Sequence, residues 1–196
     1  MGIGIGGRIV LYNGIPAGLY SIERFEALKT MFPKVDVDRF VVPPEVLDLA
    51  KNTVTLSGLK ALSNTAFDPA VAKPLGYMAV GDGAYNFTTN SRISQKSSNE
   101  ALYHQVGGLQ TILSFAQPTG TVLSGVRKEM SMTFFSENLQ ATDFVSNNQS
   151  EFFINEYGIF NTDGVLYAHI TRTNQPFDPL DQVALTVTWA SEFTIE

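Results

Sequence analysis

The last part of the chain alternates regularly between apolar and polar residues. Every second residue from Val183 to Ile195 is apolar, with the exception of Ser191, and the residues between them are small or polar throughout. Side chains on a β-strand point alternately to opposite faces, so this pattern predicts a strand with one buried face and one solvated face. It indicates that the last third of the chain is a β scaffold.

Further strands are predicted from residue 77 onward. Residues 77–80 are apolar and lead into a Gly-Asp-Gly sequence, which is a strong turn signal. Methionine and phenylalanine alternate with polar residues over 130–134, as expected of a strand. Two more strands, over 151–160 and 165–172, flank an Asn-Thr-Asp-Gly sequence, in which Asp-Gly occupies the position typical of a hairpin turn.

The first third of the sequence has a helical pattern instead. Apolar residues recur at helical spacing over residues 21–32, where Ser21 can cap the helix and Pro33 ends it. Two more short helical segments are predicted near residues 44–49 and over 57–63.

The predicted fold class is therefore mainly β with a helical N-terminal third, as an antiparallel β-sandwich or small barrel plus an N-terminal arm. The predicted domains are residues 1–50, comprising the arm and short helices, and residues 51–196, comprising the sandwich. Two interpretations stay open for residues 1–20, which are rich in glycine and apolar side chains. They form either an arm that becomes ordered against another molecule or an edge strand of the main sheet.

Composition excludes several classes of function. The chain has 196 residues, a net charge of −6 and no run of lysine and arginine, which argues against nucleic-acid binding because phosphate neutralisation needs clustered positive charge. It contains no cysteine, so disulfides, cysteine-ligated metals and thiol nucleophiles are excluded. No apolar run approaches the roughly 20 residues of a membrane helix, and we expect no membrane attachment.

The residues that could support catalysis do not form a recognisable pattern. Residues 2–7 match the glycine spacing of a dinucleotide-binding motif, but no strand can precede them as that motif requires. Neither His104 nor His169 has a second ligand at metal spacing, and Glu151 and Glu156 read as exposed acidic residues rather than as a catalytic pair. We therefore predict no catalytic residue, no cofactor and no metal, and a protein that is not an enzyme.

A partner-binding surface is predicted in the N-terminal part. Phe25, Leu28 and Phe32 lie on one side of the predicted helix, and Ile9 and Leu11 lie in the predicted arm. The alternative is that the helix packs this face on its own sheet, which is what most amphipathic helices do.

Five segments occur in an order that matches a known family. They are Asn52 to Asn64, the sequence Tyr77-Met-Ala-Val-Gly-Asp-Gly83, Asn99-Glu-Ala-Leu-Tyr103, the hairpin from Ile154 to Ala168, and the closing strand over 183–195. In this order they resemble the N-terminal, virion-attachment domain of tail-collar fibre proteins from tailed bacteriophages. The resemblance covers about residues 51–196.

The resemblance implies a structural protein of the virion, made in the host bacterial cytoplasm, that docks a fibre or bridges particle proteins in the tail, baseplate or neck. It implies other virion proteins as partners and a homo-oligomer, for which a trimer is one option. No fibre shaft follows the last strand, so we expect the attachment module alone. The residues expected to shape turns and strand crossings are Gly81, Asp82, Gly83, Gly158, Asp163 and Gly164.

Two alternatives to this function stay open. A capsid decoration protein belongs to the same class, and the sequence does not separate it from a tail component. A carbohydrate-binding or glycan-cleaving module belongs to another class, because Tyr85, Phe87 and Tyr103 lie near a long polar loop over 84–99 where aromatic rings can meet sugars.

Overall fold

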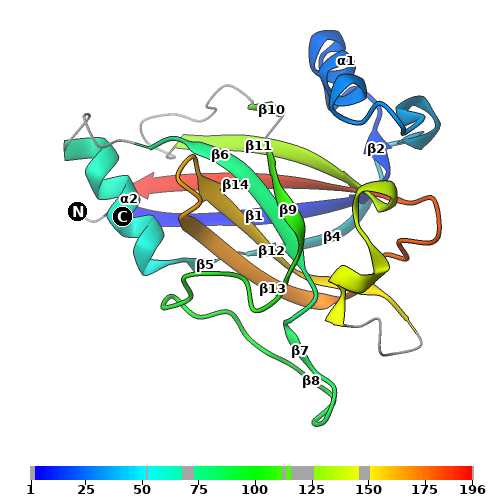
Figure 1. The fold of residues 1–196 in the computed structure, drawn as a ribbon. Helices are drawn as coiled ribbons and strands as arrows, with labels where there is room; N and C mark the ends of the chain where they lie inside the picture. The colour runs from blue at the N-terminus through cyan, green and yellow to red at the C-terminus, as the bar shows by residue number, and fades with distance from the viewer. Residues whose placement is uncertain are drawn as a thin grey trace. The chain divides into compact units, whose positions relative to one another are not determined.

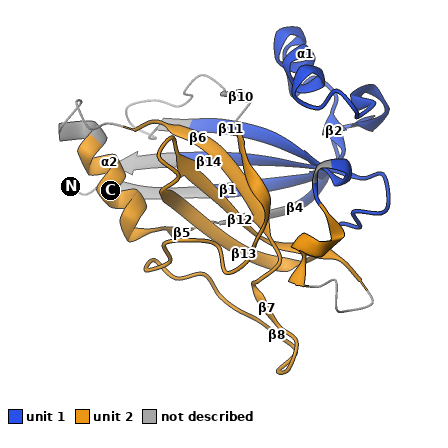
Figure 2. Ribbon diagram, in the orientation of Figure 1, with its two compact units in different colours: residues 1–51, 112–139, 177–196 blue, residues 52–111, 140–176 orange. Residues whose placement is uncertain are grey.

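The computed structural model describes residues 3–51, 53–67, 73–111, 114–115, 126–145 and 151–195. The chain divides into two compact units, which Figure 2 shows in different colours. The first unit comprises residues 1–51, 112–139 and 177–196, and the second comprises residues 52–111 and 140–176. The chain therefore leaves the first unit and returns to it twice. The predicted division into independent domains at residue 50 stays a prediction.

The first unit contains a five-stranded antiparallel sheet (Figure 1). Its strands in spatial order are β10 (Ser114–Phe115), β11 (Val126–Phe135), β14 (Ala184–Ile195), β1 (Ile3–Asn13) and β4 (Val46–Lys51). β1 pairs with β14 on one side and with β4 on the other. The glycine-rich N-terminus is thus an interior strand of the sheet, and neither predicted alternative, an arm or an edge strand, describes it.

β14 is the central strand of this sheet, and both of its faces are buried over residues 184–191. Trp189 is fully buried and pairs with Ile9 of β1 and Met130 of β11. On the opposite face Thr186 and Thr188 are also buried, so the prediction that this face is solvated is wrong. Threonine tolerates this position because its hydroxyl finds hydrogen-bond partners on the neighbouring strand, and a buried polar group without a partner would be costly.

Those partners form short chains of hydroxyl groups across the strands. The hydroxyl of Thr186 lies 2.8 Å from that of Thr133, which in turn lies 3.0 Å from the phenol oxygen of Tyr20. Ser131 and Thr188 make a second pair at 2.9 Å. The small, polar appearance of this strand face in the sequence therefore reflects cross-strand hydrogen bonding inside the unit, not contact with water.

The rest of the first unit includes one helix and a small parallel sheet. Helix α1 (Ile22–Met31) is capped by Ser21, whose hydroxyl accepts a hydrogen bond from the backbone of Arg24, so the helix predicted over 21–32 is confirmed. Strands β2 (Ile15–Pro16) and β3 (Val41–Val42) pair in parallel. Two short 3-10 turns also belong to this unit, η1 (Val37–Phe40) and η2 (Ser136–Asn138).

The second unit has its own five-stranded antiparallel sheet. Its strands in spatial order are β5 (Thr53–Val54), β13 (Leu166–Pro176), β12 (Phe153–Asn161), β6 (Leu75–Gly81) and β9 (Gln105–Thr111). The other elements are helix α2 (Leu56–Phe67), the strands β7 (Tyr85–Asn86) and β8 (Ser91–Arg92), and the 3-10 turn η3 (Ala141–Asp143). β7 and β8 form a hairpin that extends beyond the end of the sheet (Figure 1).

A small apolar cluster packs within the second unit. It consists of Ala79, Leu102, Phe160 and Leu166. Gly158 lies at its centre, where an added Cβ would stand 2.9 Å from Leu102 and Phe160 and 3.0 Å from Leu166. A side chain at this position would therefore displace its neighbours, and glycine allows the close approach that the sequence suggested for it.

The predicted fold class is wrong in its N-terminal part. Strands make up 46% of the chain, and the first third contains strands β1 to β5 beside the two helices. The segment near 44–49, predicted as helical, is strand β4, because its valine and leucine residues pair along β1. The described strands form separate sheets, mostly antiparallel, and no closed barrel.

No helix in the described part of the chain is both long and apolar enough to cross a membrane.

Candidate functional site

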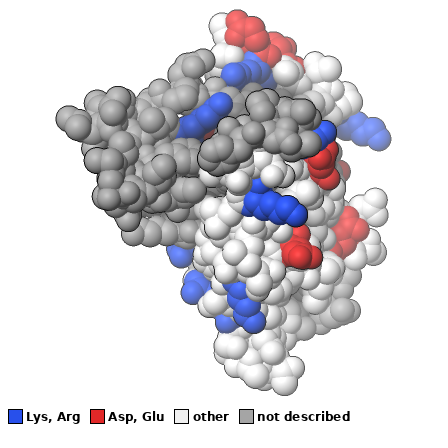
Figure 3. Space-filling view, turned by 90° about the vertical axis from the view of Figure 1, so that its left-hand side faces the viewer, with Lys and Arg blue, Asp and Glu red and all other residues white. Residues whose placement is uncertain are grey.

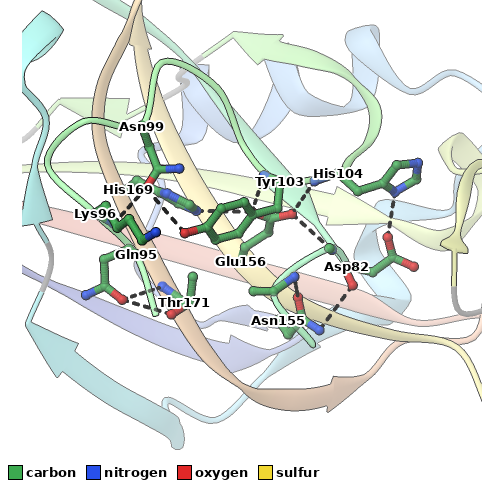
Figure 4. Close-up of polar contacts among 12 residues, drawn as sticks. Asp82, Gln95, Lys96, Asn99, Tyr103, His104, Asn155, Glu156, His169 and Thr171 are labelled. Atoms are coloured by element: carbon green, nitrogen blue, oxygen red, sulfur yellow. Dashed lines mark hydrogen bonds and ion pairs between the residues drawn. The ribbon is translucent and has the colours of Figure 1, made fainter. Parts of the chain in front are cut away.

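The most unusual side chain of the second unit is Glu156, a fully buried carboxylate on strand β12. Its Oε1 atom accepts hydrogen bonds from the backbone N–H groups of Gly83, at 3.0 Å, and His104, at 2.7 Å. Its Oε2 atom accepts from the backbone of Tyr103 at 2.8 Å and lies 3.1 Å from Nε2 of His169. Figure 4 shows the carboxylate between these groups. One side chain thereby joins a turn, a loop and two strands.

The neighbouring residue, Asn155, supports the same turn from β12. Its Oδ1 atom accepts from the backbone of Ala84 at 2.9 Å, and its Nδ2 donates to the carbonyl of Asp82 at 3.2 Å and to Oδ1 of Asn174 at 3.1 Å. The pairing of β12 with β13 is irregular here, because the register shifts between Ile154 and Glu156. Irregular pairing re-aims side chains, which explains how two consecutive residues reach one turn.

Asp82 and His104 form a second pair of a carboxylate and an imidazole. Oδ1 of Asp82, which is fully buried, lies 2.7 Å from Nδ1 of His104, whose side chain is 40% exposed. The backbone N–H of Asp82 also donates to the carbonyl of His104 at 3.1 Å. A Cβ at Gly81 or Gly83 would collide with the backbone of His104, so glycine is required at both positions. The Gly-Asp-Gly sequence predicted as a turn therefore also packs closely against the backbone of His104.

The buried imidazole of His169 completes the arrangement. Its Nε2 atom faces Glu156, while Nδ1 has no hydrogen-bond partner in the described part of the structure. We assign the tautomer with the proton on Nε2, because that nitrogen alone has an acceptor to donate to. The ring of Tyr103 packs edge-on against His169 at 5.4 Å, and its hydroxyl donates to the carbonyl of Ser94 at 2.8 Å. The seven residues Asp82, Gly83, Tyr103, His104, Asn155, Glu156 and His169 are called the Glu156 cluster below.

A glutamine side chain closes the outer edge of β13 beside this cluster (Figure 4). Oε1 of Gln95 accepts from the backbone and the hydroxyl of Thr171, at 3.4 and 2.8 Å, while its Nε2 donates to the hydroxyl of Thr53 on β5 at 3.2 Å. The pairing of β5 with β13 covers only Thr53 and Val54. Gln95 therefore satisfies an edge position that would otherwise offer unpaired backbone groups.

The hydrogen bonds of the Glu156 cluster connect backbone segments and have a structural role. Both oxygens of Glu156 are occupied by backbone donors and an imidazole, so neither is free to accept a proton from a substrate. Across the described residues, no group of three or more His, Cys, Asp or Glu side chains is placed to hold a metal ion. The ring of His104, which is held by Asp82, is partly exposed, and so is Tyr103.

The sequence interpretation missed this site although it named several of its members. Glu156, His104 and His169 converge, whereas Glu151 is exposed and takes no part. One signal was available. In the sequence, Glu156 alternates with the apolar or small residues Ile154, Gly158 and Phe160, and a carboxylate at such a position of a predicted strand indicates burial.

The predicted partner-binding residues lie mainly in the core of the first unit. Ile9 and Leu11 on β1 are buried, as are Leu28 and Phe32. Phe25 is partly exposed and lines an apolar pocket described below. Within a single chain, four of the five side chains are thus covered, and their role in binding a partner stays a prediction.

The remaining residues named from the sequence occupy distinct places. Gly164 has a positive φ of 77° in the turn between β12 and β13, and Asp163 in the same turn forms an ion pair with Lys73 at 3.5 Å. Tyr85 and Phe87 pack against each other, with ring centres 5.2 Å apart, and both contact Phe153.

The glycine motif at the N-terminus has no nucleotide-binding context in the structure. Gly2 lies outside the described residues, and residues 3–7 belong to β1, where they pair with β14. No helix follows directly to receive a pyrophosphate, since β1 continues to Asn13.

Charged side chains are dispersed on the face shown in Figure 3. Lysine and arginine side chains stand in several separate places, with aspartate and glutamate between them and large uncharged areas around them. The described part of this face therefore offers no continuous basic patch of the kind that nucleic-acid binding requires.

Comparisons of the chain with protein-family models, with curated proteins and with solved structures give no match.

Proposed function

We propose that this protein is a structural component of a bacteriophage particle, a module that docks a fibre or bridges particle proteins in the tail, baseplate or neck. The proposal rests on the ordered sequence resemblance to tail-collar fibre proteins and on what the matching residues do in the fold. They hold backbone segments of the second unit together. Such residues maintain the shape of the module, which is what docking onto other particle proteins requires.

The observation that carries the proposal is the convergence of the matching segments on Glu156. The Gly-Asp-Gly turn after β6, the segment that ends at Tyr103 and the hairpin that contains Glu156 lie far apart in the sequence. Their contacts with the carboxylate use backbone N–H groups, which every residue type except proline provides. Sequence elements of a reaction centre would instead present free side chains to a substrate.

An apolar pocket in the first unit supports a role in binding other proteins. It has a volume of about 270 Å³ and lies between β2, β3 and the start of α1, where Tyr20, Ile22, Phe25 and Val41 contribute to its walls. Ile22 is 80% exposed and Val41 is 42% exposed. Clustered exposed apolar side chains are typical of surfaces that are covered in an assembly.

The test is the protein content of purified particles. Phage particles from cells that carry the gene for this chain are purified on a density gradient, washed in high salt and quantified by mass spectrometry. We expect the chain to sediment with the particles at a constant ratio to the capsid protein. A chain that is abundant in the lysate but missing from the particles would contradict the proposal.

Copy number and two matched variants refine this test. A dozen copies or fewer per particle supports the tail, baseplate or neck, whereas hundreds would support a capsid decoration protein. Ile22→Asp places a charge in the apolar pocket, and Leu180→Asp places one at another exposed apolar residue, which is 78% exposed and does not line the pocket. If the pocket contacts a particle protein, Ile22→Asp reduces incorporation and Leu180→Asp leaves it unchanged.

A glycan array distinguishes the carbohydrate-binding alternative from the structural proposal. Tyr85 and Phe87 pack on Phe153, and the hydroxyl of Tyr85 contacts Asn90, so these rings are engaged within the protein. Array binding that Phe87→Ala abolishes, in a chain that is missing from particles, would replace the structural proposal with this alternative.

A further inference from the structure

The second unit contains a polar pocket that lies apart from the Glu156 cluster. Its volume is about 280 Å³. One wall is formed by Ser57, Lys60 and Asn64, which lie on one face of helix α2 because they are spaced by three and four residues. The other wall is formed by Lys73, which precedes β6, by Asn161 at the end of β12 and by Asp163 in the turn that follows.

Both walls are held in place by hydrogen bonds within the protein. Thr55 caps the start of α2 by accepting from the backbone of Gly58 at 2.9 Å, and its own hydroxyl donates to the carbonyl of Leu166 at 2.7 Å. Gly58 lies so close to the backbone of Tyr167 that no Cβ fits between them. The helix is thus fixed against β13, and the pocket is formed before any ligand arrives.

The opposite wall is fixed by the side chain of Asn161. Its Oδ1 atom accepts from the backbone N–H groups of Asp163, at 3.0 Å, and Val165, at 2.9 Å. These two bonds identify the oxygen and leave Nδ2 as a donor. Asn161 is only 4% exposed, and no described residue accepts a hydrogen bond from its Nδ2. Because Asn161 lines the pocket, this donor is open to it, and a ligand or water can accept a hydrogen bond from it.

The other groups in the pocket are also mainly donors. Lys60 has no ion-pair partner among the described residues, and Lys73 is paired with Asp163 at 3.5 Å. The pocket therefore carries two ammonium groups and one carboxylate in a chain whose net charge is −6. One positive charge remains for an anionic ligand, and the Asp163 carboxylate can accept hydrogen bonds from hydroxyl groups.

We infer that this pocket binds a small hydroxylated monocarboxylate, a sugar acid. The volume fits one ring of monosaccharide size and lies near the lower end for ligand pockets. Lys60 and the Nδ2 of Asn161 face the ligand carboxylate, and Ser57, Asn64 and Asp163 bind its hydroxyl groups. A phosphate dianion fits less well, because Asp163 would repel its second charge. The inference goes beyond the proposed structural role and does not depend on it.

The test uses the full-length chain and monosaccharide probes. The ¹H–¹⁵N spectrum of the protein is recorded during titration with glucuronate, with glucose as the uncharged counterpart and with inorganic phosphate as the competing anion. We expect glucuronate to shift the amide signals around Ser57 and Gly164 with a dissociation constant of about 1 mM. Glucose and phosphate should bind at least about tenfold more weakly, because each lacks one part of the recognised chemistry.

Two lysine variants provide the matched comparison. Lys60→Ala removes the unpaired ammonium group of the pocket, and Lys96→Ala removes an exposed ammonium group elsewhere in the same unit. We expect Lys60→Ala to weaken glucuronate binding at least about tenfold and Lys96→Ala to leave it unchanged. Unperturbed signals at saturating glucuronate, equal affinity for glucose, or tighter binding of phosphate would each overturn the inference.

A further probe separates the two sources of such a ligand. A short oligomer of galacturonate that binds at least as tightly as the monosaccharide points to the end of an acidic polysaccharide. Binding of the monosaccharide alone points to a free sugar acid. Both results retain the pocket chemistry, and failure of particle incorporation would bear only on the proposed structural function.

Discussion

Nε2 of His169 lies 3.1 Å from Oε2 of Glu156, and both side chains are fully buried. The pair lies at neighbouring strands, since His169 is on β13 and Glu156 is on β12. Three backbone N–H groups complete the coordination of the same carboxylate. A buried carboxylate is tolerated only when its oxygens are fully hydrogen-bonded, and here those bonds fix the loop and turn that the sequence motifs encode.

Glu156→Gln should destabilise the second unit strongly. The amide keeps the shape of the side chain but has one acceptor oxygen, so at least one of the backbone donors loses its partner. We expect the unfolding free energy to fall by about 2–4 kcal/mol, measured by urea denaturation with far-UV circular dichroism. Glu100→Gln, at an exposed position of the same unit, serves as the control and should change it by less than about 0.5 kcal/mol. Equal effects of the two variants would contradict a tie at Glu156.

Three glycine-to-alanine variants should separate in a defined order. Gly81→Ala places a methyl group against the backbone carbonyl of His104, and Gly158→Ala places one against the side chains of Leu102, Phe160 and Leu166. Side chains yield more easily than backbone, so we expect a loss of about 1–3 kcal/mol for Gly158→Ala and a larger loss for Gly81→Ala.

Gly108→Ala is the control of this series, because an added Cβ there has no neighbour within 4 Å and needs no positive φ. Its effect should stay within about 0.5 kcal/mol, by thermal melting of all three variants under the same conditions. A Gly81→Ala protein as stable as Gly108→Ala would show that the turn does not rest on His104.

Removing different hydroxyl groups from the chain formed by Tyr20, Thr133 and Thr186 should lower the unfolding free energy by different amounts. Thr133 lies between Tyr20 and Thr186, so Thr133→Val leaves the buried phenol of Tyr20 without a partner, whereas Thr186→Val leaves Thr133 and Tyr20 paired. We expect a loss of about 1–3 kcal/mol for Thr133→Val and about 1 kcal/mol for Thr186→Val.

A double variant checks this explanation. Tyr20→Phe combined with Thr133→Val removes the orphaned phenol and should recover part of the stability that Thr133→Val loses, as measured in a double-mutant cycle by urea denaturation. Strictly additive losses would argue against the chain of hydroxyl groups.

Stability should fall at alkaline pH because of Tyr20. Burial raises the pKa of this phenol far above its ordinary value, and the hydrogen bond with Thr133 lowers it by a smaller amount. Above a pH of about 10 the unfolded chain loses the phenol proton while the folded protein keeps it. The folded state then holds more protons, so the unfolding free energy decreases as pH rises, by at most about 1.4 kcal/mol per pH unit for this group.

Urea denaturation from neutral pH to a pH of about 11 measures this dependence. The contribution of Tyr20 is fully present below its unfolded pKa and is lost as the pH rises towards its folded pKa. Tyr20→Phe should reduce the slope, and Tyr167, whose pKa is also raised by burial, should account for part of what remains. An identical slope in the wild-type protein and in Tyr20→Phe would contradict this assignment.

The sequence correctly predicted those helices and turns that depend on only a few neighbouring residues. Helix α1 follows from Ser21 and the helical spacing after it, and the turn before Gly164 follows from its Asp-Gly sequence. The segment near 44–49 failed because valine and leucine at that spacing suit either a helix or a strand, and pairing with β1 decided in favour of β4.

The Glu156 cluster was beyond local patterns for a different reason. Glu156 lies 73 residues from Gly83 and 53 from Tyr103 in the sequence. The residues next to each of them therefore give no indication that the three meet in the fold. The same holds for Thr186 and Thr133, whose separation is 53 residues and whose burial depends on their hydrogen bond. Polar residues read as solvated in both places, because their partners become visible only when the strands are paired.

Amide hydrogen exchange of Gly83, Tyr103 and His104 tests most directly whether one carboxylate holds these segments. In the wild-type protein we expect all three amides to be strongly protected, although they lie outside the regular strand ladders. In Glu156→Gln at least one of them should exchange about tenfold faster or more, while the amide of Val187 in the first unit keeps its rate. Three amides that are unprotected in the wild-type protein, or equally protected in both proteins, would contradict the account.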